Sequence, residues 1–218
     1  MPTDASLGGS GPGPGDVGTT PRRIGVFGGT FDPVHVGHLV AAVNARYAAK
    51  LDKVLMVVAN QPWQKLPTRT ITPARDRYAL VEAAVAGVEG LEASSLEIDR
   101  GGISYTADTL AELAGAEPGA ELYLVVGSDL VRELHTWDRV DEVVKLATLI
   151  VVNRPGAEWA GEEPTVPSMR LLEVRIPALE ISSTDLRQRA ANGRPLDFLV
   201  PDSAIRWIRE RGLYATDG

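Results

Sequence analysis

Apolar residues gather along the chain in short runs of strand length, and segments of helical periodicity separate these runs. The first run, Ile24 to Phe27, ends in paired glycines. From His38 to Lys50 the apolar residues recur at the spacing of one helical face. A continuous apolar run from Val54 to Ala59 is typical of a strand that is covered on both faces. This order of strand, helix and strand predicts a βαβ unit whose two strands are parallel.

The same alternation continues to the end of the chain. We predict strands over residues 91–98, 121–126, 148–152 and 171–176, and helices over 73–86, 106–115, 138–146, 182–191 and 201–211. Thr72 is predicted to cap the first of these helices, with Pro73 at its first position. The pattern predicts an α/β fold, a Rossmann-like, doubly wound, mostly parallel sheet. Ligands on such sheets bind beyond the carboxyl ends of the strands.

Composition separates the N-terminal end from the rest of the chain. Residues 1–20 are almost wholly Gly, Pro, Ser, Thr and Asp, which predicts a disordered tail before a single domain over 21–218. The net charge of −7 argues against binding to nucleic acid. No apolar run approaches the roughly 18 residues of a membrane span. The absence of cysteine and of a secretory signal pattern leads us to expect a cytoplasmic protein.

The segment from Arg22 to Leu39 combines a strand, a glycine turn and a helix start with two histidines, His35 and His38. Free amides and the positive dipole end make a helix start a natural anion site. Zinc is disfavoured, since cysteine is absent and His135 is the one further histidine, so we expect no resident metal. Two surface histidines without function remain an alternative. We favour imidazole donors for a phosphate chain, because neither GxGxxG nor a P-loop motif is present.

A second helix start, Ile181 to Arg187, carries three consecutive hydroxyl residues and an arginine one turn into the helix. Ser182 and Asp185 make a capping box, which an ordinary structural helix can also have. The same donors suit polyphosphate oxygens, with charge-assisted bonds worth roughly 1.5–3 kcal/mol each. Taken alone, the segment leaves both interpretations open.

The loop from Asn60 to Ile71 is long for an α/β unit, and long loops more often act on ligands than merely connect elements. Lys65 lies within this loop. A ligand contact is possible for Lys65, for the pair Tyr105-Thr106 and for Trp137. The local sequence fits equally well with a solvated Lys65 and with the other residues in the core or in a lid.

Taken in order, several motifs resemble the nucleotidyltransferase superfamily that is marked by HxGH and ISSTxxR. They are GGTFDPVHVGH, the loop over 60–65, SYTADTL, GSDL, Thr136-Trp137 and ISSTDLR. The greatest similarity is to the bacterial nicotinate-nucleotide adenylyltransferases, from about Arg22 to Tyr214. The resemblance implies the nucleotidyltransferase fold. It also implies a step of NAD biosynthesis, in which ATP carrying Mg²⁺ and nicotinate mononucleotide give nicotinate adenine dinucleotide and pyrophosphate.

The resemblance also implies a role for each motif residue. Phosphate contacts and stabilisation of the transition state fall to His35, His38, Lys65 and Arg187, with His38 the best candidate for the latter. The ATP site is implied at Gly28, Gly29, Thr30, Phe31, Gly127, Asp129, Ser182, Ser183 and Thr184. The acceptor site is implied at Asn60, Tyr105, Thr106 and Trp137, with the indole stacked on the pyridine ring.

Two positions depart from the family pattern. The loop reads Trp63-Gln64-Lys65 where relatives commonly have Pro-His-Lys or Pro-His-Arg, and Asp138 instead of an aromatic residue follows Trp137. Three alternatives therefore stay open: a pantetheine-phosphate adenylyltransferase on the same fold, nicotinamide mononucleotide as the acceptor, and a non-catalytic nucleotide sensor. The sequence leaves the oligomeric state open, a homo-oligomer included.

Overall fold

The computed structural model describes residues 20–62, 70–131, 133–153, 166 and 168–215. The predicted tail, apart from Thr20, lies outside these residues, and so does Lys65.

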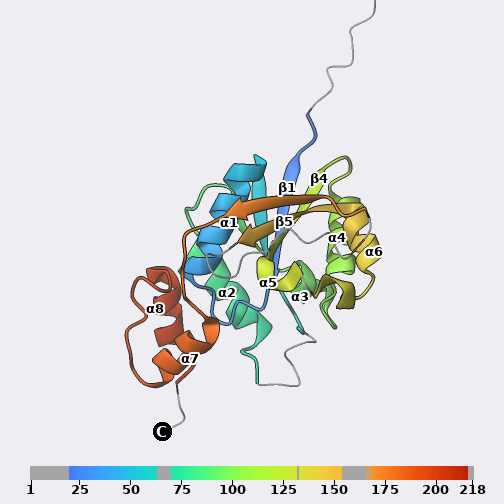
Figure 1. Ribbon diagram of the computed structural model, residues 1–218. Helices are drawn as coiled ribbons and strands as arrows, with labels where there is room; N and C mark the ends of the chain where they lie inside the picture. Colours follow the sequence, from blue (N-terminus) through green and yellow to red (C-terminus); the bar gives the residue numbers. More distant parts are fainter. Residues whose placement is uncertain (1–19, 63–69, 132, 154–165, 167, 216–218) are drawn as a thin grey trace, which may run out of the picture.

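In the described part of the chain, six strands form one parallel sheet in the order β3-β2-β1-β4-β5-β6 (Figure 1). The strands are β1 (Arg23–Gly29), β2 (Lys53–Val58), β3 (Leu91–Ser94), β4 (Glu121–Gly127), β5 (Ala147–Asn153) and β6 (Leu171–Arg175). The chain builds outward from β1 in one direction and from β4 in the other. This is the doubly wound order predicted from the sequence, and its switch point lies between β1 and β4, where such sheets bind ligands.

Helices cover both faces of this sheet (Figure 1). They are α1 (Val36–Ala49), α2 (Ala74–Val85), α3 (Leu96–Arg100), α4 (Thr106–Ala116), α5 (Ser128–Val131), η1 (Leu134–Thr136), α6 (Val140–Leu146), α7 (Ser183–Ala191) and α8 (Asp202–Glu210). None of the helices in the described ranges is long and apolar enough to cross a membrane.

The two hydrophobic cores explain why β2 is apolar from Val54 to Val58. Val54, Met56 and Val58 belong to the core that includes α1, α2 and α8, whereas Leu55 and Val57 belong to the core that includes α4 and α6. Alternate side chains of a strand point to opposite faces, so a strand covered by helices on both sides has no position for a polar residue. The prediction of a doubly covered strand is confirmed.

The predicted strand over Leu91 to Ile98 is wrong in its second half, where the short helix α3 replaces it. Leu96 and Ile98 alternate with polar residues as in a strand, which explains the error. The Ser95 hydroxyl donates to Asp99 Oδ2 at 2.6 Å, a local bond between residues four apart that a helical turn permits.

Smaller differences concern the helices. α2 begins at Ala74 with Pro73 as its N-cap, one residue later than predicted. α6 begins at Val140, since Arg139 adopts a left-handed conformation with φ of 50° and cannot continue a helix from 138. The turn after β4 contains α5, which the sequence pattern did not predict.

Candidate functional site

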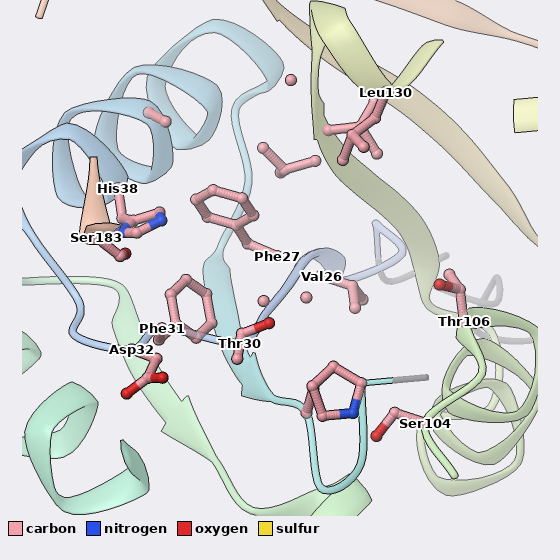
Figure 2. A pocket seen from close by; sticks show the side chains of 18 of the residues that line it. Val26, Phe27, Thr30, Phe31, Asp32, His38, Ser104, Thr106, Leu130 and Ser183 are labelled. Carbon is pink, nitrogen blue, oxygen red and sulfur yellow. The ribbon is translucent and has the colours of Figure 1, made fainter. Parts of the chain in front are cut away.

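A cavity of about 610 Å³ opens at the carboxyl ends of β1 and β4 (Figure 2). Its lining includes most of the residues that the motifs singled out: Gly28, Gly29, Thr30, Phe31, His35, His38, Tyr105, Thr106, Gly127, Asp129, Trp137, Ser182, Ser183, Thr184 and Arg187. Asn60 lies next to the lining residue Ala59 and is not itself in the lining. The fold therefore brings both predicted helix starts to one cavity, together with the predicted aromatic residues.

The two histidines form one end of the cavity. His35 is the N-cap of α1, and its ring stacks on that of His38 with 3.7 Å between the ring centroids. The backbone N–H of His35 donates to His38 Nδ1 at 3.2 Å. Since Nδ1 accepts this bond, Nε2 carries the proton of a neutral His38 ring and is its N–H donor. The rings of Phe31 and His38 lie nearly perpendicular with their centroids 5.0 Å apart, and this contact restricts the plane of the imidazole further.

The turn after β1 requires a glycine at position 29. Phe31 has a positive φ of 49°, and its ring folds back over the end of the strand. A Cβ atom at Gly29 would lie 2.7 Å from that ring, closer than carbon atoms approach one another. Gly29 therefore allows Phe31 to pack edge-on against Phe27, with ring centroids 5.7 Å apart. The paired glycines serve the packing of this turn as well as access to the cavity.

The start of α7 is bonded directly to the turn after β1. Ser183 Oγ donates to the Pro33 carbonyl at 2.9 Å, and Arg187 Nη1 donates to the Asp32 carbonyl at 2.7 Å. Ser182 Oγ accepts from the Asp185 N–H at 3.1 Å, which confirms the half of the predicted capping box that Ser182 supplies. The Asp185 carboxylate accepts from Arg189 Nε at 2.6 Å. In Figure 2, Ser183 lies beside His38. Two helix N-termini, those of α1 and α7, thus meet at the same end of the cavity, which favours an anionic ligand there.

The opposite end of the cavity is formed by the segment that leads into α4. The backbone N–H of Asn60 donates to Ser104 Oγ at 2.9 Å, and Asn60 Nδ2 donates to the Gly102 carbonyl at 2.8 Å. The Asn60 amide, predicted to contact substrate, is used here to hold this segment in place. Ser104 and Thr106 lie on the other side of Thr30 from His38 in the view of Figure 2.

Arg139 links two parts of this end. Its Nε donates to Asp138 Oδ1 at 2.6 Å, and its Nη2 lies 2.7 Å from Asp108 Oδ1 on α4. The guanidinium carbon lies 5.9 Å from the centroid of the Tyr105 ring, within cation–π range. The hydrogen bond to Asp138 raises the pKa of Arg139 above its usual value, and the bond to Asp108 contributes a smaller increase. Arg139 thus joins the segment that carries Trp137 to the start of α4.

Several lining residues were not predicted, among them Asp32, Glu97, Ser104 and Thr109. Glu97 is 7% exposed and accepts from Thr109 Oγ1 at 2.6 Å. The strand predicted over residues 91–98 hid it, because Glu97 lies in the short helix α3 that replaces the second half of that strand. Within the described ranges there is no group of three or more His, Asp or Glu residues that could hold a metal ion.

The chain is similar to known proteins of one family. A family model described as cytidylyltransferase-like matches residues 26–189. A protein of Saccharopolyspora erythraea is 47% identical over 193 residues, with 88% of this chain and 90% of its own covered. One of Mycolicibacterium vanbaalenii is 41% identical over 206 residues, with 92% and 96% covered. Both are named probable nicotinate-nucleotide adenylyltransferase.

A solved structure supports the fold. The nicotinic acid mononucleotide adenylyltransferase of Plasmodium falciparum, complexed with NaAD, superposes with a TM-score of 0.72. The alignment covers 88% of this chain and 97% of the other, at 19% sequence identity. The sheet and its flanking helices are therefore shared.

Proposed function

Because the chain belongs to the cytidylyltransferase-like family, and within it to the nicotinate-nucleotide adenylyltransferases, we propose that it transfers the adenylyl group of ATP to nicotinate mononucleotide. The products are nicotinate adenine dinucleotide and pyrophosphate. The observation that carries the proposal is the single cavity in which the His35–His38 pair and the start of α7 face the Tyr105–Thr106 segment and Trp137.

The reaction forms a bond between a phosphate oxygen of the mononucleotide and the α-phosphorus of ATP. The bond from that phosphorus to the bridging oxygen breaks, and pyrophosphate leaves with the electron pair. This chemistry needs alignment of the two reactants and stabilisation of the charge that develops on the transferred and leaving groups. His38 Nε2 and the amides at the start of α7 are donors suited to this second task.

The two ends of the cavity divide the substrates between them. The triphosphate lies at the end with His35, His38 and Arg187, where two helix starts meet. The pyridine ring lies at the other end, against Trp137 and the Tyr105–Thr106 segment, and Asp129 meets the ribose of ATP. Lys65 remains a predicted phosphate contact, since it lies outside the described residues.

Mg²⁺ fits this site as a companion of ATP. The donors at the triphosphate end are N–H and O–H groups, which bind phosphate oxygens. Mg²⁺ itself usually keeps several waters and is bound through one or two carboxylates together with the phosphates of the substrate. Of the aspartates in the lining, Asp129 is exposed and could share such an ion with the phosphates, whereas Asp32 is 1% exposed and its Oδ1 accepts from Tyr214. When bound, the ion neutralises charge on the triphosphate.

The absence of cysteine from the sequence supports the further proposal that the reaction takes place in the cytoplasm.

A panel of acceptors tests the proposed function. The purified full chain is supplied with Mg-ATP and, in separate reactions, with nicotinate mononucleotide, nicotinamide mononucleotide or phosphopantetheine, and pyrophosphate release is measured. We expect turnover with nicotinate mononucleotide at a kcat/KM at least about ten-fold above the other two, an energy difference of about 1.4 kcal/mol. Turnover with phosphopantetheine alone would refute the assignment. ATP binding without turnover of any acceptor would favour the nucleotide sensor.

A further inference from the structure

Arg77 is a buried cation on the core face of α2. It is 1% exposed and shares this face with Leu80, Val81 and Ala84. A guanidinium group in such a place must have hydrogen-bond acceptors, because its desolvation is costly. Three backbone carbonyls serve: Nε donates to Thr72 at 2.8 Å, Nη1 to Thr30 at 2.8 Å and Nη2 to Asn60 at 3.1 Å.

These carbonyls lie where the sheet ends. The ladder between β1 and β2 closes with the bond from the Ala59 N–H to the Gly29 carbonyl at 2.9 Å. Thr30 follows Gly29 at the end of β1, and Asn60 follows Ala59 just after β2. The carbonyls of both residues accept from the guanidinium of Arg77. The rigid, planar fork of arginine suits two such acceptors. Arg77 therefore connects the segments that follow β1 and β2, beyond the last hydrogen bond between the two strands.

The two connected residues lead to opposite ends of the cavity. Thr30 lines the cavity directly after Gly28 and Gly29, at the nucleotide end. Asn60 donates its backbone N–H to Ser104 Oγ, and Ser104 immediately precedes Tyr105 at the acceptor end. Arg77 lies outside the lining, bonds directly to Thr30 in one wall and is connected to the other wall through Asn60 and Ser104.

From this arrangement we infer that Arg77 is a positioning residue, which sets the distance between bound ATP and the bound acceptor. The inference rests on the proposed function. In-line attack requires the reacting atoms to be about 3–3.5 Å apart, and a displacement near 1 Å can cost on the order of 10²-fold in rate. Each substrate still contacts its own end of the cavity when the connection is lost. The loss should therefore fall on kcat and leave both KM values nearly unchanged.

The test compares Arg77→Met and Arg77→Lys with a control on the same helix. Arg75→Met removes an arginine whose side chain is 67% exposed and paired with Asp99 at the surface. Each full-length variant is assayed for kcat and for the KM of both substrates, well below its own melting temperature. We expect kcat to fall about 10²-fold in Arg77→Met and less in Arg77→Lys, which keeps a charged donor. Both KM values should stay within about three-fold, and Arg75→Met should match the wild type.

The inference is overturned if a folded Arg77→Met variant keeps the kcat of Arg75→Met, or if its losses appear in KM alone. A fall in melting temperature with unchanged kcat would assign Arg77 to stability only. If Arg77→Met does not fold, Arg77→Lys decides by the same criteria. Failure of the proposed function is seen separately, as a wild-type chain that does not turn over nicotinate mononucleotide.

Discussion

Tyr214 donates its phenolic hydrogen to Asp32 Oδ1 across 2.9 Å, although the two are 182 positions apart in the sequence. Asp32 is 1% exposed, and its carbonyl accepts from Arg187 on α7. The turn after β1 is therefore held from two later parts of the chain, α7 and the segment after α8. The C-terminal segment thus reaches the wall of the cavity and is part of the structure that shapes it.

Tyr214→Phe removes this bond and leaves the ring. A buried hydrogen bond to a charged acceptor contributes on the order of 1–3 kcal/mol, so we expect the free energy of unfolding to fall by about 1–2 kcal/mol. Urea unfolding at neutral pH measures the change. Tyr47→Phe is the matched control, since Tyr47 is 86% exposed and its loss of a hydroxyl should have no effect. Equal stability of the two variants would show that the Tyr214–Asp32 bond contributes nothing.

The same bond predicts a loss of stability at alkaline pH. Burial raises the pKa of Tyr214 above its usual value, and the negative charge of Asp32 raises it further. In the unfolded chain the hydroxyl titrates near pH 10. The folded protein therefore keeps a proton that the unfolded chain releases. The contribution of Tyr214 to the free energy of unfolding is constant below about pH 10 and is lost as the pH rises above that value.

Urea unfolding of the wild type and of Tyr214→Phe at about pH 8 and about pH 10.8 tests this expectation. Other groups titrate in both proteins, including Tyr78, whose pKa is also raised by burial. Their effects cancel in the comparison. The wild type should lose more free energy of unfolding than the variant between the two pH values, and equal losses would contradict the assignment.

His38→Ala is expected to lower kcat by roughly 10²-fold, the usual cost of removing one preorganised donor to a developing charge. The bond from the His35 N–H to His38 Nδ1 and the contact with Phe31 preorganise the ring. His135→Ala is the control, because His135 is exposed on η1 and is not in the cavity lining. Steady-state pyrophosphate release measures both. A His38→Ala variant with the kcat of His135→Ala would remove His38 from the mechanism.

The parts of this structure that the sequence predicts best are those governed by periodicity. The apolar run of β2 and the spacing in α1 report directly on burial, so the parallel sheet and its helices follow from them. The error at α3 has the same origin: Leu96 and Ile98 satisfy the strand period, whereas the local bond of Ser95 to Asp99 that a helical turn permits leaves no trace in the hydrophobic pattern.

The site divides in the same way. Motif residues such as His38 and Ser183 could be predicted to share a cavity, because both lie in the first turn of a helix at the carboxyl edge of the sheet. Arg77 could not, since its partners are backbone carbonyls whose positions depend on the tertiary fold. The sequence does contain one indication, because Arg77 falls on the same helix face as the apolar residues Leu80 and Ala84. Asn60 is the opposite case: its motif position predicts a substrate contact, but its side chain donates to the Gly102 carbonyl.

Gly127→Ala is expected to weaken ATP binding. The Asp129 carboxylate folds back over Gly127, and a Cβ atom there would overlap the carboxylate oxygen, so the aspartate must rotate away from its place in the cavity. If Asp129 holds the ribose of ATP, the loss of a charge-assisted bond worth roughly 1.5–3 kcal/mol should raise the KM for ATP about ten-fold or more. The KM for nicotinate mononucleotide should change little, because that substrate lies at the other end. Gly115→Ala is the matched control: a Cβ atom at this exposed helical position meets no neighbour, so stability should rise slightly and the kinetics stay unchanged. A Gly127→Ala variant with the wild-type KM for ATP would show that Asp129 is not a nucleotide contact.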